Sequence, residues 1–289
     1  MKVTPWHQTN WDARAAANFM CGGSGTGLLF VATLAAQDSY RITALIAMAL
    51  VALGLTCVWL EIGRPWRALN VFLHPQTSWM TREGMAAPLM FAPGAVAVWQ
   101  GGGTFAWVAA FFGLVFLYCQ GRILLASKGI PAWREPKIMP LIISTGLVEG
   151  VGLASLLAVI IPGNPAPGWF AGTLLAALAM RRLSWRWYFG ALETQGAPKQ
   201  ALQVLRSFGG RFELLSQTMP EMMLVAVIFI FHDMTWLLPL AGLLATAGGW
   251  GMKFTIVARA AFNQGFALPV LPVRGQGAVM PGVKPGWTK

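Results

Sequence analysis

Two acidic residues inside long apolar stretches are the first candidates for chemistry. Glu149 lies in the middle of a stretch at 138–161, and Glu221 follows Pro220 inside another at 212–232. Ionisable side chains within a membrane segment are rare, and they mark proton or ion pathways or polar contacts between helices. Because a carboxyl group can take up and release a proton, a proton relay and a structural tie between helices are both open for Glu149 and Glu221.

A second group of polar residues fills the segment at 61–83, between two apolar stretches. Its charged or titratable members are Glu61, Arg64, Arg67, His74, Arg82 and Glu83, and Trp66 and Trp79 lie among them. Charged residues bracketed by tryptophans are typical of the membrane–water interface. Such a segment could form a rigid hydrogen-bonded cap, dock a soluble subunit or line a ligand site, and composition does not rank these three possibilities.

Histidine and cysteine limit the cofactors that the chain could hold. The three histidines lie outside the centres of the apolar stretches, at His7, His74 and His232. A membrane haem is normally held by histidines within helices. The three cysteines stand singly, at Cys21, Cys57 and Cys119. Without a CxxC pair, we expect no iron–sulfur cluster and no zinc or other metal site, and we also expect no haem.

The elements that must position these residues are transmembrane helices. Of the 289 residues, 56% are hydrophobic and 11% charged, whereas soluble domains carry about 25% charged residues. Eight apolar stretches approach the ~20 residues that span hydrocarbon, at 15–37, 42–62, 82–100, 104–125, 138–161, 168–188, 212–232 and 236–260. Since a segment in lipid must satisfy its own backbone hydrogen bonds, we expect an all-α membrane protein with about eight helices.

The order of the stretches predicts how the chain is divided. We expect a transmembrane domain at 1–265, with two four-helix bundles at roughly 15–125 and 138–260. The segment at 197–208 combines apolar residues with Lys199 and Arg206, which predicts a helix lying in the membrane interface. The remaining residues, 266–289, are rich in proline and are expected to form an extended cytoplasmic tail.

The basic residues lie mainly on one side of the predicted membrane domain. A net charge of +11 in a soluble chain would indicate nucleic-acid binding. Here, every one of the 21 Lys and Arg except Arg41 falls nearer the side that holds both termini and the loops near 63–81, 126–137 and 189–211. The positive-inside rule places that side in the cytoplasm. We therefore expect a multi-pass protein of the bacterial inner membrane that contacts lipid and binds no nucleic acid.

Two motifs in the polar segment resemble a known family of membrane subunits. The run EIGRPWRA at 61–68 is similar to the LGRP-x-R-A motif of the NrfD/PsrC and DmsC-like anchors of molybdopterin oxidoreductases. The run SWMTRE at 78–83 resembles their entry to the third helix, and WDARAAANF at 11–19 resembles their entry to the first. The resemblance covers most of the chain, and the anchors of phenylacetyl-CoA:acceptor oxidoreductase-like enzymes are the nearest branch.

This resemblance implies a role in electron transfer. Such anchors hold a molybdopterin catalytic subunit and a ferredoxin-like iron–sulfur subunit, and they exchange electrons with menaquinone or ubiquinone without haem. The chain would then be the quinone-reactive, non-catalytic subunit of a molybdenum or tungsten enzyme of anaerobic respiration.

The resemblance also implies a set of pocket residues. Asn18 would hydrogen-bond a quinone oxygen, and Tyr118 would be a second donor. Some members have a histidine where this chain has Cys21. Because cysteine is a poor proton donor to quinone, proton donation would move to His74 or a carboxylate. The full set is Asn18, Cys21, Glu61, Arg64, His74, Trp79, Arg82, Glu83 and Tyr118.

Two other functions fit the same sequence. A proton-coupled transporter would use Glu149 and Glu221 and would work in liposomes without partners. A purely structural anchor would use Arg64, Arg82 and Glu83 to fix the loop and the docking surface, since interfacial charges commonly serve as anchors.

Overall fold

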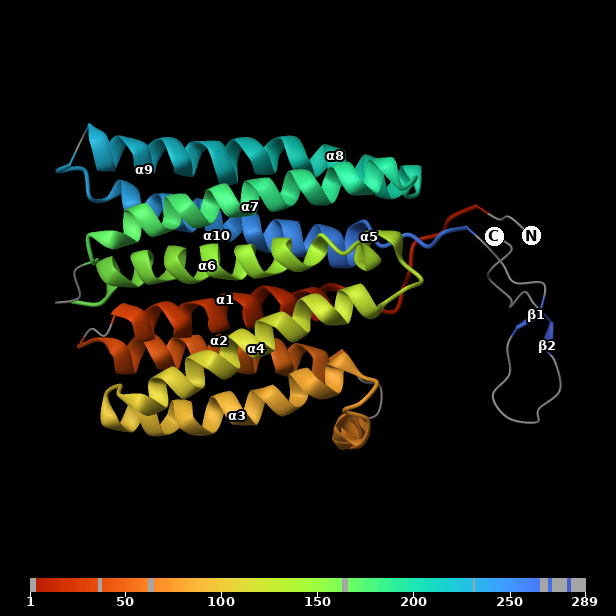
Figure 1. Ribbon diagram of the computed structural model, residues 1–289, viewed down its shortest axis with the longest axis horizontal. Helices are drawn as coiled ribbons and strands as arrows, with labels where there is room; N and C mark the ends of the chain where they lie inside the picture. The colour runs from red at the N-terminus through yellow and green to blue at the C-terminus, as the bar shows by residue number, and fades with distance from the viewer. Residues whose placement is uncertain are drawn as a thin grey trace.

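The computed structural model describes residues 4–35, 38–61, 65–162, 166–230 and 232–265 and the pairs 270–271 and 280–281. Its long helices lie side by side along one axis (Figure 1). The α-helices are α1 (Ala13–Ala35), α2 (Tyr40–Glu61), α3 (Trp79–Gln100), α4 (Thr104–Ala126), α5 (Pro131–Arg134), α6 (Ile138–Ile160), α7 (Trp169–Thr194), α8 (Lys199–Glu213), α9 (Met219–Phe229) and α10 (Leu237–Phe254). The shorter elements are the 3-10 helix η1 (Pro65–Leu73), the π-helical turns η2 (Leu214–Thr218) and η3 (Thr255–Arg259), and the antiparallel strands β1 (Val270–Leu271) and β2 (Met280–Pro281).

Six helical segments among the described residues are long and apolar enough to cross a membrane. They are α1, α2, α4, α6, the continuous rod Lys199–Phe229 formed by α8, η2 and α9, and the rod Leu237–Arg259 formed by α10 and η3. The predicted stretches at 82–100 and 168–188 also form helices, α3 and α7. However, α7 carries Arg181, Arg182 and Arg186, and α3 contains two prolines and begins near Arg82 and Glu83. The chain is thus an all-α, multi-pass membrane protein.

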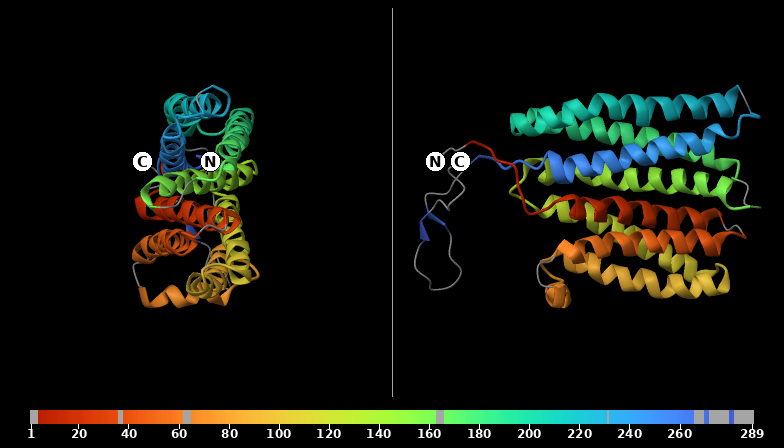
Figure 2. Two further views of the ribbon diagram at one scale, coloured as in Figure 1. Left: turned by 90° about the vertical axis from the view of Figure 1, so that its left-hand side faces the viewer. Right: turned by 180° about the vertical axis from the view of Figure 1, so that it is seen from behind.

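Helix α1 lies at the centre of the protein. It packs against α2, α4, α6 and α10, and α6 packs in turn against α7 and α10 (Figure 2). The contact between α1 and α6 is close because it is built from glycine: a Cβ on Gly27 would lie 2.0 Å from the carbonyl oxygen of Gly146. Small residues let helix backbones approach in this way. Helices α1 and α6 therefore join α2–α4 on one side to α7–α10 on the other.

We expect Gly27→Ala to lower the melting temperature of the purified protein. The added methyl group would meet backbone, which cannot rotate away, and overpacking of this kind typically costs about 1–3 kcal/mol. Gly172→Ala on α7 is a matched control, since no atom lies within 4 Å of a Cβ at that position. Thermal unfolding in detergent, followed by circular dichroism, compares the two. An equal loss in both variants would contradict the close α1–α6 contact.

The prediction of an interfacial helix at 197–208 is wrong. Helix α8 continues through η2 into α9 as one rod of 31 residues beside α7 (Figure 1). Its apolar side faces other helices, because Ala201, Leu205 and Phe212 are buried. The amphipathic pattern that suggested a membrane surface reflects helix–helix packing at the charged end of the protein.

The segments that flank the helices are tied together at the same end. The backbone N–H of Gln8 donates to the carbonyl of Ala261, and that of Asn263 donates to the carbonyl of Trp6. The Nε2 atom of His7 lies 2.7 Å from the carbonyl oxygen of Ala258. Residues 6–8 therefore run antiparallel to residues 261–263, so the chain enters α1 and leaves η3 on one side.

Candidate functional site

A narrow pocket opens at the charged end, between the first residues of α1 and α3 and the last residues of α2 and α4. It is lined by Trp11, Ala15, Asn18, Phe19, Val58, Glu61, Met80, Glu83 and Ile123. Three of the polar residues predicted for the site, Asn18, Glu61 and Glu83, therefore come together, although they lie in three different helices. Asn18 and Glu83 are buried, and Glu61 is partly exposed.

Hydrogen bonds hold the polar residues of this pocket in place. The Asn18 Nδ2 atom donates to Glu83 Oε1 at 3.2 Å, and Gln120 Nε2 donates to the backbone carbonyl of Asn18 at 2.9 Å. Within the described part of the chain, the oxygens Asn18 Oδ1, Glu61 Oε1 and Gln120 Oε1 are buried and receive no donor. Buried acceptors without a donor are uncommon and call for a water or ligand.

The free volume of the pocket is about 30 Å³. That is room for water rather than for a ring. The thioether side chain of Met80 lies at the wall and is 42% exposed. Because methionine is flexible, it is the wall residue most able to move aside for a flat ligand.

Beside the pocket, two guanidinium groups lie over the Trp79 ring. Arg82 is 4.0 Å and Arg122 is 4.5 Å from the centroid of the indole, and Tyr118 meets the indole edge-on at 5.8 Å. Tyr118 is 42% exposed and does not line the pocket. The guanidinium nitrogens of Arg82 donate to the carbonyls of Pro75 and Gln76 at 2.8 and 2.9 Å.

We expect Arg82→Lys to loosen the turn at 74–78. A lysine ammonium is a point charge and cannot reproduce the planar fork that stacks on Trp79 and reaches two carbonyls. Limited proteolysis should therefore cleave this turn several-fold faster than in the parent protein. Arg186→Lys, on the exposed surface of α7, is the control, and faster cleavage in that variant alone would refute the role of Arg82.

The remaining predicted pocket residues are not gathered here. Cys21 lies on α1 about one turn further from the charged end than Asn18, and it is buried. His74 is exposed in the turn after η1. Arg64 lies outside the described residues, as do the two residues before it.

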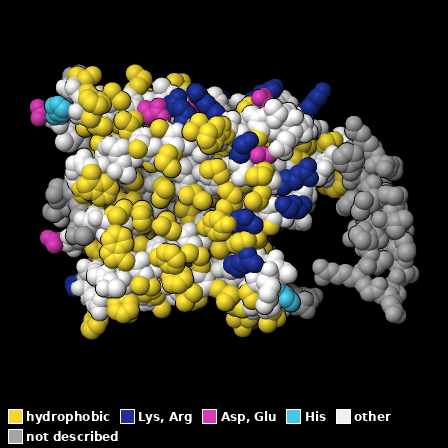
Figure 3. Space-filling model, viewed as in Figure 1, with side chains coloured by type: hydrophobic (Ala, Val, Ile, Leu, Met, Phe, Trp, Pro, Cys, Tyr) yellow, Lys and Arg dark blue, Asp and Glu magenta, His cyan; other side chains and the backbone are white. Residues whose placement is uncertain are grey.

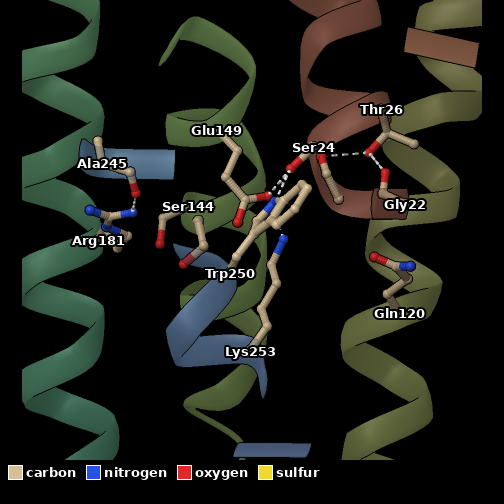
Figure 4. A network of polar contacts seen from close by, with 12 residues as sticks. Gly22, Ser24, Thr26, Gln120, Ser144, Glu149, Arg181, Ala245, Trp250 and Lys253 are labelled. Atoms are coloured by element: carbon tan, nitrogen blue, oxygen red, sulfur yellow. Dashed lines mark hydrogen bonds and ion pairs between the residues drawn. The ribbon is translucent and has the colours of Figure 1, made fainter. Parts of the chain in front are cut away.

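A second polar cluster is enclosed at the contact of α1, α6 and α10 (Figure 4). Glu149 Oε2 accepts from Lys253 Nζ at 2.6 Å and from Ser24 Oγ at 2.8 Å, and Trp250 Nε1 donates to Ser24 Oγ at 2.8 Å. Both members of the ion pair are 0% exposed. The α1 backbone leaves room for the lysine, since a Cβ on Gly23 would lie 2.3 Å from Lys253 Nζ.

A buried arginine lies on the far side of this cluster. Arg181 of α7 is 0% exposed and donates to the carbonyls of Ala245 and Ser216 at 2.7 and 2.5 Å and to Gln217 Oε1 at 3.3 Å. The π-helical turn η2 presents two of these acceptors. Arg181 and Lys253 are among the basic residues counted toward the cytoplasmic side, and both are enclosed between helices.

No family model matches the chain. It is 27% identical over 176 residues to one of the subunits of a sulfite dehydrogenase from Allochromatium vinosum, and the match covers 52% of this chain and 52% of that protein. The chain is thus similar to a subunit of a redox enzyme. It spans about half the length of this curated relative.

The two predicted relay carboxylates lie in different settings. Glu149 belongs to the enclosed cluster, whereas Glu221 pairs with Arg182 at 2.7 Å, and each of these side chains is 22% exposed. Lys253, Arg181 and Gln120 were not predicted as partners. The sequence could have singled out Arg181, because an arginine inside the apolar stretch predicted at 168–188 is unusual. Within the described residues, no group of His, Cys, Asp and Glu is placed to hold a metal ion.

Proposed function

We propose that this chain is the quinone-reactive membrane subunit of a multi-subunit redox complex. It would hold a ferredoxin-like iron–sulfur subunit and a molybdopterin subunit, with molybdenum or tungsten, on the cytoplasmic side of a bacterial inner membrane. Electrons would pass between that iron–sulfur subunit and menaquinone or ubiquinone. The similarity to a sulfite dehydrogenase subunit supports a place in a redox complex.

The observation that carries the quinone proposal is the pocket containing Asn18, Glu61 and Glu83. It is mostly apolar, and its few polar groups converge from three helices, which is the usual form of a small-molecule site. Its buried acceptors without donors suit a ligand that carries hydroxyl groups. The pocket also lies at the end of the bundle that is rich in basic residues, where the proposed partners would dock.

Each polar residue has a role in this proposal. The amide of Asn18 can donate from Nδ2 to a carbonyl oxygen and accept at Oδ1 from a hydroxyl group. The carboxylates of Glu61 and Glu83 can accept a proton released from a hydroxyl group or return it. Gln120 fixes the backbone of α1 at Asn18 through its hydrogen bond to the carbonyl. A bound quinone supplies a two-electron, two-proton couple.

The same proposal includes eight membrane crossings, with α3 and α7 as the seventh and eighth spanning helices. The arginines of α7 do not oppose this, because Arg181 is enclosed and Arg182 is paired with Glu221. Charges in a membrane are tolerated when they face the bundle or a partner charge. We also propose that Glu149, with Lys253, and Glu221, with Arg182, relay protons.

Purification from the native membrane tests this function. We expect mass spectrometry to find an iron–sulfur subunit, a molybdopterin subunit and a quinone with the chain. A chain that arrives without partners and without quinone, and that transports protons with a solute in liposomes, would replace the proposal with a transporter. A chain that arrives with partners but never with quinone would make it a structural anchor.

A further inference from the structure

The connection between α4 and α6, residues 127–137, carries basic side chains without acidic partners. Lys128 and Lys137 are exposed, and Arg134 is partly exposed. None of these three forms an ion pair with a carboxylate of the described residues. The guanidinium of Arg134 donates to the backbone carbonyl of Lys128 at 3.1 Å, so the arginine is held beside that lysine.

The acidic residue of this connection faces inward. Glu135 is buried, and its Oε2 atom accepts from Gln195 Nε2 at 2.5 Å. Its Oε1 atom accepts from the backbone N–H of Lys137 at 3.4 Å. The carboxylate therefore does not balance the cations on the outer surface. Figure 3 shows Lys and Arg side chains gathered toward this end of the protein, with few acidic side chains among them.

The connection is fixed firmly to the ends of the helices below it. Residues 131–133 are buried. The indole Nε1 of Trp133 donates to the carbonyl of Ile256 at 2.8 Å, and the hydroxyl group of Tyr188 donates to the carbonyl of Ala132 at 2.7 Å. A surface that is already ordered loses little conformational entropy when a partner binds, so this connection is well suited to docking.

The connection also lies next to the pocket. Trp133 stacks on Trp11 with ring centroids 4.7 Å apart, and Trp11 lines the pocket. Ile123, another lining residue, belongs to the last turns of α4, just before the connection. A molecule bound on the outer surface of the connection is therefore separated from the pocket by two stacked indole rings.

Position and charge together indicate what binds there. Helix α5 packs against α4 and η3, and in Figure 1 it lies at the charged end, level with α6 and α10 in the middle of the row of helices. Lipids surround the outer edge of a bundle, whereas a subunit that sits on its end covers the middle. A cluster of cations without partners attracts a protein surface of the opposite charge.

We propose that the α4–α6 connection docks an acidic face of the partner subunit that exchanges electrons with the pocket. Lys128, Arg134 and Lys137 pair with carboxylates of that subunit, and the stacked Trp133 and Trp11 keep the contact next to the pocket. The proposal rests on the proposed function, because it gives the place and the charge of the contact with the proposed partner.

Cross-linking with a carbodiimide tests the docking site on the complex purified from its native membrane. This reagent joins a lysine directly to a carboxylate that it contacts. We expect mass spectrometry of the peptides to find Lys128 and Lys137 joined to Asp or Glu of one partner subunit. Lys199, exposed on α8 at the same end, is the control and should not be joined to a partner. High salt should reduce the links, because it screens exposed charges.

Charge reversal gives a second test. The triple variant Lys128→Glu, Arg134→Glu, Lys137→Glu should retain the partner at least about tenfold more weakly, since like charges repel across an interface. The milder Lys128→Gln, Lys137→Gln leaves the hydrogen bond of Arg134 in place and should give a smaller loss. The control Lys199→Glu, Arg211→Glu reverses two exposed charges on α8 and should retain the partner like the parent.

Several outcomes would overturn the docking site. Partners that copurify but are joined through Lys199, and not through Lys128 or Lys137, would place the contact elsewhere and leave the proposed function intact. So would a triple variant that keeps its partners but loses bound phosphatidylglycerol, which would make the connection a lipid headgroup site. A parent chain that arrives with no partner would refute the proposed function and the docking site together.

Discussion

Lys253→Met is expected to destabilise the protein by about 3–5 kcal/mol. The substitution leaves Glu149 enclosed between α1, α6 and α10 without its cation, and removing one partner of a buried ion pair is strongly destabilising because the other charge stays uncompensated. The hydrogen bond from Ser24 to Glu149 remains but does not neutralise the carboxylate. The loss should appear as a large drop in melting temperature and as increased proteolysis in detergent.

Two further variants distinguish the loss of the ion pair from nonspecific destabilisation by a substitution. The double variant Glu149→Leu, Lys253→Met removes both charges and should recover most of the loss, because an apolar pair of similar volume is often neutral in stability. Lys199→Met, at the exposed start of α8, is the matched control and should melt like the parent protein. A single Lys253→Met variant that is as stable as Lys199→Met would show that the enclosed pair does not stabilise the fold.

Asn18→Leu is expected to lower quinone-linked activity of the intact complex by about 10²-fold, the usual effect of removing one positioned hydrogen-bond donor. Leucine has nearly the same size, but it cannot exchange hydrogen bonds with a bound ring or with Glu83. Activity of the partner subunits with a soluble dye should be unchanged, because that reaction bypasses the pocket. Both activities are measured on the same membranes.

Matched variants sharpen this test. Asn10→Leu changes an exposed asparagine of the N-terminal segment and should keep full activity. Gly54→Ala should give an intermediate loss, because its Cβ would lie 3.1 Å from Asn18 Oδ1 and shift the amide. If Asn18→Leu keeps full quinone-linked activity, the pocket is not the quinone site.

Helix positions were largely predictable from the sequence. The stretches expected at 42–62, 104–125 and 138–161 correspond to Tyr40–Glu61, Thr104–Ala126 and Ile138–Ile160. The run at 199–229 was not predictable as one rod, because Pro220 normally ends or begins a helix. The π-helical turn η2 comes just before this proline, and the rod continues through both. Because π-helical turns are rare, one was not expected here.

The polar contacts were predictable only in part. Glu149 stands out because a carboxyl group among apolar residues is rare. Lys253 does not stand out, since a lysine near the end of an apolar stretch usually extends to the membrane surface. Only the packing of α10 against α1 and α6 turns it inward. The meeting of Asn18 with Glu83 likewise depends on packing between helices 65 residues apart in sequence.

The pairing of residues 6–8 with residues 261–263 limits the number of times that the chain can cross the membrane. Two segments that share backbone hydrogen bonds lie on one side of a membrane, so the chain between them must cross an even number of times. Six and eight crossings satisfy this condition, and seven does not. Helices α3 and α7 must therefore both cross or both fail to cross if the other six segments span. A reporter fused before α1 and one fused after η3 would report the same compartment.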